Sequence, residues 1–158
     1  VLSDDFDEME RQANEIQSWG SNVFVKVPIT NTKGDSSKDL IKRISDLNLN
    51  VTAVMTPQIK HIMMTLKPHH IMSVFVGRIN DAGYTTPRFR QFRIGWPKVL
   101  WASTRQIYSV IEAEEKGYDI ITLTPELIAK LPLRGKDLTE YSRETVQMFY
   151  EDGRGLSI

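Results

Sequence analysis

The sequence predicts an α/β protein in which helices and parallel strands alternate, as in a (β/α) barrel. Runs rich in Val, Ile and Thr alternate with stretches in which apolar residues recur at helical spacing. The links between them are short and polar, which favours βα units within one domain. The expected strands cover residues 23–29, 49–55, 71–79, 98–102 and 118–123, and the expected helices cover residues 5–18, 40–47, 57–66, 104–116, 125–131 and 137–151.

Several of these elements also carry local start signals. The polar cluster Ser3-Asp4-Asp5 is typical of a helix N-cap and precedes apolar residues at helical spacing. Pro57 and Pro125 each stand where a helix should begin, and a proline in the first turn costs no hydrogen bond. The expected strands are short runs of β-branched residues, which suit a pleated and buried surface.

The composition is that of an ordinary globular protein. The 158 residues are 41% hydrophobic and 25% charged, and 20 Lys and Arg balance 20 Asp and Glu. Zero net charge favours neither nucleic acid nor an anionic membrane, so any anion site must be local. Cysteine is absent, which excludes disulfides and thiolate chemistry. We expect one domain over residues 1–158, a cytoplasmic location and no membrane partner.

One lysine interrupts the most apolar of the expected strands. Lys26 stands between Val25 and Val27 in a run that ends at Pro28, and we expect this strand to be buried on both faces. Burial of an ammonium is costly and lowers its pKa. A neutral amine can attack a ketone carbonyl and form a Schiff base. The alternative is that Lys26 reaches solvent or pairs with an acid.

Four segments resemble, in order, those of the transaldolase and fructose-6-phosphate aldolase family of class I aldolases. The segment V-K-V-P-I-T at 25–30 is similar to the family's Schiff-base strand. N-V-T at 50–52, S-V-F-V-G-R-I at 73–79 and L-W-A-S-T-R at 100–105 resemble its later motifs. The resemblance implies a TIM barrel, here incomplete, with about five to six parallel strands. The family's first two strands, with their aspartate and T-T-N-P turn, have no counterpart, so we expect an N-terminally truncated barrel.

The resemblance also implies the roles of residues near the strand ends. Lys26 would form the imine with a sugar phosphate. Asn50 and Thr52 would bind substrate hydroxyls and the catalytic water, which makes Thr52 a second catalytic candidate. Ser73 would hydrogen-bond the substrate in the same way. Spacing alone leaves open that these three polar side chains only make strand-end hydrogen bonds.

A second group would bind the phosphate of the substrate. Arg78, Ser103 and Arg105 resemble the family's clamp, and a guanidinium fork matches phosphate oxygens. For Arg78, a structural ion pair is the alternative. Phe75 stands where aldolase members of the family tend to carry tyrosine, and its lack of a hydroxyl favours transfer of the bound unit over its release.

The implied function is transfer of a dihydroxyacetone unit between sugar phosphates in the pentose phosphate pathway, with neither cofactor nor metal. The alternatives are a fructose-6-phosphate aldolase and a non-catalytic remnant that binds sugar phosphates. Because the family's N-terminal strands are missing, we expect little aldol activity from this chain alone.

Three further features give weaker indications. Arginines and aromatic residues alternate over residues 88–96, a pattern that can bind RNA, but zero net charge favours a truncated crossover or a solvated loop. Histidines 61, 69 and 70 have no acid or cysteine at ligand spacing, so no metal site is expected. The apolar face from Leu138 to Phe149 would either support a homo-oligomer or fold back on its own barrel.

Overall fold

A computed structural model describes residues 1–89 and 94–155 of the chain. The chain divides into two compact units, Val1–Leu123 and Thr124–Ile158. Each unit is described by itself below. The expectation of a single domain over residues 1–158 stays a prediction.

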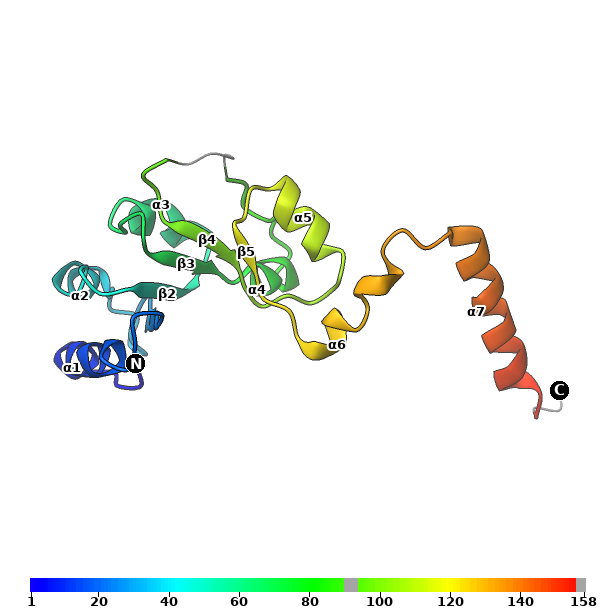
Figure 1. Cartoon of the computed structure of the whole chain (residues 1–158), viewed down its shortest axis with the longest axis horizontal. Coiled ribbons are helices and arrows are strands. Elements are labelled where there is room, and N and C mark those ends of the chain that lie inside the picture. Colours follow the sequence, from blue (N-terminus) through cyan, green and yellow to red (C-terminus); the bar gives the residue numbers. More distant parts are fainter. Residues whose placement is uncertain (90–93, 156–158) are drawn as a thin grey trace. The chain divides into compact units, whose positions relative to one another are not determined.

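The first unit is a parallel sheet with helical crossovers (Figure 1). Its strands lie in the order β1-β2-β3-β4-β5, so each strand pairs with its neighbour in sequence. The strands are Val25–Pro28 (β1), Leu49–Val54 (β2), Ile71–Val74 (β3), Lys98–Trp101 (β4) and Ile120–Ile121 (β5), and the helices are Phe6–Gln17 (α1), Lys38–Arg43 (α2), Thr56–Met63 (α3), Val76–Asp81 (α4) and Ser109–Glu115 (α5). This arrangement confirms the predicted α/β class and an incomplete barrel of five parallel strands.

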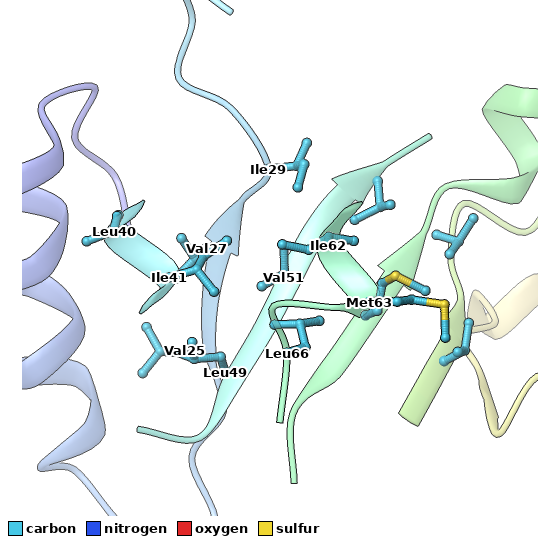
Figure 2. Packing of buried hydrophobic residues seen from close by; sticks show 14 of the residues in the cluster. Val25, Val27, Ile29, Leu40, Ile41, Leu49, Val51, Ile62, Met63 and Leu66 are labelled. Atoms are coloured by element: carbon cyan, nitrogen blue, oxygen red, sulfur yellow. The ribbon is translucent and has the colours of Figure 1, made fainter. Parts of the chain in front are cut away.

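The core lies where alternate strand residues meet the helices. Val25 and Val27 of β1 and Val51 of β2 are fully buried, because residues two apart on a strand share a face. Figure 2 shows the cluster that they form with side chains of α2 and α3. Its helical members include Leu40, Ile41, Ile62 and Met63.

Capping explains how α1 begins. The carboxylate of Asp5 accepts hydrogen bonds from the backbone N–H groups of Asp7 and Glu8 at 3.1 and 2.9 Å. This is the N-cap role that the acidic cluster predicts. Asp4 does not cap the helix. Its carboxylate accepts hydrogen bonds from the N–H and the hydroxyl of Thr32 at 2.6 and 2.8 Å. The start of α1 is thereby joined to the loop that follows β1.

The strand expected over residues 71–79 is wrong in its second half. β3 ends at Val74, and residues 76–81 form α4 instead. At Gly77 the backbone comes so close to the chain after β4 that an added Cβ would stand 1.6 Å from the Ser103 carbonyl oxygen. The last strand and the helix before it are also shorter than expected, at Ile120–Ile121 and Ser109–Glu115.

The second unit contains two helices and one 3₁₀ turn, Pro125–Ile128 (α6), Leu131–Leu133 (η1) and Leu138–Gly153 (α7). Thr124 and Asp137 cap the two helices through their side chains. No residue of α7 is buried. Within the described ranges, no helix has the length and apolar character that a membrane crossing requires.

Candidate active site

Three neighbouring strands bring several expected site residues together. Lys26 of β1 lies opposite Asn50 of β2, and Thr52 is two residues farther along the same strand. The hydroxyl of Ser73 on β3 donates a hydrogen bond of 2.6 Å to Oδ1 of Asn50. Lys26, Asn50, Thr52 and Ser73 therefore share one face of three adjacent strands.

Lys26 is exposed, which corrects the expectation of a strand buried on both faces. Val25 and Val27 on either side of it have no exposed surface, so only the face that packs against the helices is covered. Lys26 lies on the opposite face. Its side chain forms no hydrogen bond or ion pair with another described residue, so pairing with an acid is not seen either. Burial therefore does not supply the activation of the amine that the sequence argument invoked.

The end of β2 is irregular next to Thr52. Ala53 has a φ of 60°, and the register between β2 and β3 shifts between Val51 and Val54. Such a bulge changes the direction of the neighbouring side chains. The hydroxyl oxygen of Thr52 is buried and has no hydrogen-bond partner among the described residues. An unsatisfied buried hydroxyl costs about 1–3 kcal/mol, so Thr52 lacks the partner that such a group usually has.

The expected phosphate-binding residues come together through the close approach at Gly77. Ser103 follows β4 and has a φ of 62°, and its carbonyl group packs on Gly77 at the start of α4. Cγ of Arg105 lies 3.1 Å from the position that a Cβ on Gly77 would take. Arg78 is the next residue of α4. Ser103 and Arg105 thus contact the helix turn that carries Arg78.

The two guanidinium groups have different surroundings. Arg78 is exposed, and its guanidinium carbon lies 5.6 Å from the centre of the Phe75 ring, within cation–π range. The structural ion pair considered for Arg78 is not present among the described residues. Arg105 instead forms an ion pair with Asp81 at the end of α4. Neither Gly77 nor Asp81 was expected to act at this site, although a glycine directly before Arg78 is a signal of close backbone approach.

Other candidates lie apart from this group. Trp101 is 1% exposed and packs on Tyr118 with ring centres 5.0 Å apart, so it belongs to the core. Of the residues considered for RNA binding, Arg90, Phe92 and Arg93 lie outside the described residues. Among those described, no group of three His, Cys, Asp or Glu residues is placed to hold a metal ion.

The fold and the edge residues define a class. Parallel strands joined by helices, with polar and cationic side chains at the carboxyl ends, are the arrangement of a (β/α)-barrel site.

Comparison with known proteins specifies this class further. The profile of the family described as Transaldolase/Fructose-6-phosphate aldolase matches residues 1–157. The chain belongs to the transaldolase/fructose-6-phosphate aldolase family, as its four motifs predicted.

Three relatives, each named as a probable transaldolase, show how far the similarity extends. The protein of Nitrosopumilus maritimus is 29% identical over 139 residues, which are 83% of this chain and 61% of that protein. The protein of Maridesulfovibrio salexigens is 29% identical over 154 residues, 91% and 71% of the two chains. The protein of Roseiflexus castenholzii is 32% identical over 126 residues, 75% and 56%. The chain thus spans a little over half to about seven tenths of these relatives.

Proposed function

We propose that this chain takes part in transaldolase-type chemistry, the transfer of a dihydroxyacetone unit between sugar phosphates in the pentose phosphate pathway. The observation that carries the proposal is the placing of Lys26 beside Asn50 on one face of the sheet, with Thr52 and Ser73 near it. Arg78 on α4, with Ser103 and Arg105 on the segment after β4 that packs against Gly77, supplies charge and a hydroxyl for a phosphate.

The reaction proceeds through an imine on Lys26. The amine of Lys26 attacks the ketone carbonyl of the donor, and loss of water gives a protonated imine. This imine takes up the electron pair of the C3–C4 bond when that bond breaks, the C4 hydroxyl gives its proton to water, and an aldose phosphate leaves. The resulting enamine then attacks the aldehyde of a second aldose phosphate, whose oxygen takes a proton back from water. Hydrolysis of the imine restores the lysine and releases the new ketose phosphate.

The polar residues of β2 and β3 suit the hydroxyl groups of the donor and the water of these steps. Ser73 donates to Oδ1 of Asn50, so the amide NH₂ of Asn50 is directed away from that bond and can donate to a substrate oxygen. The unpartnered hydroxyl of Thr52 suits the water that hydrolyses the imine. Phe75 offers no hydroxyl for that water, which favours transfer to an acceptor over release of dihydroxyacetone.

Trapping with borohydride tests the role of Lys26. The chain is incubated with fructose 6-phosphate and borohydride, and peptides are mapped by mass spectrometry. We expect a reduced adduct on Lys26, because borohydride converts an imine into a stable secondary amine. The adduct should be absent from a Lys26→Met variant.

Lys98 provides the matched control for this experiment. It is exposed and lies at the same level of the sheet, opposite Ile71, which in turn lies opposite Asn50. A Lys98→Met variant should be labelled as the unaltered chain is. Equal labelling of Lys26 and Lys98 would mean nonspecific reaction of exposed amines, and the Schiff-base proposal would then be withdrawn.

The exposure of Lys26 favours a second candidate, a sugar-phosphate-binding chain without turnover. An amine on an open face is not shielded from solvent. The free aldolase is the nearest alternative to transfer, and analysis of products with and without an erythrose 4-phosphate acceptor separates the two.

We also propose that the chain forms a homo-oligomer through α7 and that it is located in the cytoplasm.

A further inference from the structure

A single carboxylate holds the guanidinium of Arg105 against α4. Oδ2 of Asp81 accepts from Nε of Arg105 at 3.1 Å and lies 2.9 Å from Nη2. The two residues are 24 positions apart in sequence. Their side chains are 56% and 54% exposed, so the pair contributes little to folding stability. The contact therefore matters more for the orientation of the Arg105 guanidinium than for stability.

The geometry of the contact leaves one side of the guanidinium free. A guanidinium carries five N–H donors in a rigid plane. Asp81 engages the edge formed by Nε and Nη2, so the N–H groups of Nη1 and the second N–H of Nη2 remain available. Because the group is planar, fixing one edge also fixes the direction of the other. A phosphate can then receive two parallel hydrogen bonds from that second edge.

The same helix turn places Asp81 beside Arg78. Residues three apart on a helix are neighbours on its surface, and α4 carries Arg78 in its first turn and Asp81 at its end. The contact between Gly77 and the Ser103 carbonyl keeps α4 against the chain that leads to Arg105. Asp81 thus lies on the same helix as Arg78 and pairs with Arg105. Its negative charge also reduces the repulsion between the two arginines.

We propose that Asp81 is a positioning residue of the phosphate site, which directs the free edge of Arg105 toward the phosphate of a bound sugar phosphate. This inference rests on the proposed function, because it assumes that Arg105 binds that phosphate. It assigns to Asp81 an effect on affinity that runs against simple electrostatics. Loss of a negative charge near an anion site should strengthen anion binding, whereas loss of a positioning group should weaken it.

Calorimetric titration of the full chain tests the opposing signs. Fructose 6-phosphate and unphosphorylated fructose are titrated into the unaltered chain, Asp81→Asn and Arg105→Ala. We expect Asp81→Asn to weaken binding of fructose 6-phosphate by up to about fivefold, the upper end of the range for one exposed ion pair. Binding of fructose and the midpoint of urea unfolding should not change. Asp39→Asn is the matched control, since it removes an exposed pair with Lys42 on α2.

The outcomes separate the two levels of the argument. Equal or tighter binding of fructose 6-phosphate by Asp81→Asn, with a loss in Arg105→Ala, overturns the role of Asp81 alone. If phosphate adds no affinity in the unaltered chain, or Arg105→Ala causes no loss, the phosphate site of the proposed function fails and the inference fails with it. Partial recovery in Asp81→Glu, which keeps the carboxylate, would support positioning over a change in fold.

Discussion

Backbone strain in the first unit occurs at the proposed site. Among the described residues, Ala53 and Ser103 are the two with a side chain that adopt positive φ, at 60° and 62°. For an L-residue this conformation costs about 1–2 kcal/mol. Ala53 lies near the end of β2 next to Thr52, and Ser103 follows β4 within the proposed phosphate clamp. Strain of this kind persists where the surrounding structure or a ligand requires it.

Ser103→Gly should separate stability from phosphate binding. Glycine adopts positive φ without the steric cost, but it loses about 0.5–1 kcal/mol of backbone entropy on folding. The net expectation is a free energy of unfolding that is unchanged or higher by up to about 1.5 kcal/mol. Affinity for fructose 6-phosphate should fall because the hydroxyl is lost. Urea unfolding and calorimetric titration measure the two effects.

Ala53→Gly is the control for that variant. It relieves the same strain at the end of β2 without removing a hydroxyl, so stability should respond similarly while phosphate affinity stays the same. A Ser103→Gly chain that binds fructose 6-phosphate normally would exclude its hydroxyl from the clamp. A loss of stability above about 1 kcal/mol would show that the positive φ is not strained.

At the scale of elements, sequence patterns predicted where the strands lie better than they predicted which faces of the strands are covered. The runs of β-branched residues predicted where β1 and β2 lie in the sequence. The run around Lys26 suggested two covered faces, yet Phe24 is 41% exposed and Lys26 faces solvent. Periodicity reports which residues are apolar, and it does not report whether a second layer covers them. The end of β3 was missed because it depends on Gly77 meeting Ser103, a contact between distant segments.

The contacts within the site also differ in how far the sequence predicts them. Motif order placed Asn50 and Ser73 near one another, and the structure joins them by a hydrogen bond. The ion pair of Asp81 with Arg105 could not be predicted, because no local pattern links residues 24 positions apart. The buried hydroxyl of Thr52 lies next to the bulge at Ala53. No glycine or proline marks this bulge in the sequence, so it could not be predicted.

A buried histidine joins two βα units of the sheet. Nδ1 of His70 accepts from the N–H of Lys67 at 3.0 Å. The other ring nitrogen, Nε2, then carries the proton and donates toward the carbonyl oxygens of Ser45 and Leu47 at 3.1 and 3.2 Å. Burial, with the nearby charge of His69, lowers the pKa of His70 from 6.5 to about 4. The folded chain therefore holds this ring neutral.

Folding stability should consequently fall in mild acid. The unfolded chain takes up a proton on His70 near pH 6.5, whereas the folded chain resists protonation down to about pH 4. The contribution is fully present above that window and decreases by about 3 kcal/mol as the pH falls through it. Urea unfolding between these pH values measures the loss.

Two substitutions identify the source of that pH dependence. His70→Gln keeps a polar side chain without a titrating ring, so the slope of stability against pH should flatten. His61→Gln removes an exposed histidine and should leave the slope as it is. An unchanged slope in His70→Gln would assign the acid sensitivity to other groups.

At the scale of the whole molecule, the second unit leaves its longest helix without a buried residue. α7 has 16 residues, and its large apolar side chains are exposed. They are Leu138, Tyr141, Val146, Met148, Phe149 and Tyr150. Helices of this length gain most of their stability from packing of an apolar face. A contiguous apolar surface on such a helix is typical of an interaction site.

We expect this face to pack against a second copy of the chain. Sedimentation velocity should then show a species larger than one chain of 18.1 kDa. The double variant Leu138→Ser, Phe149→Ser should shift the chain toward the monomer, because each serine removes about 1.5–3 kcal/mol of apolar burial from every contact. Trp19→Ser alters a side chain of the first unit that is 70% exposed and should leave the mass unchanged. A monomer at all concentrations in the unaltered chain would instead mean that α7 packs on its own barrel, which is the alternative that its apolar face predicts equally well.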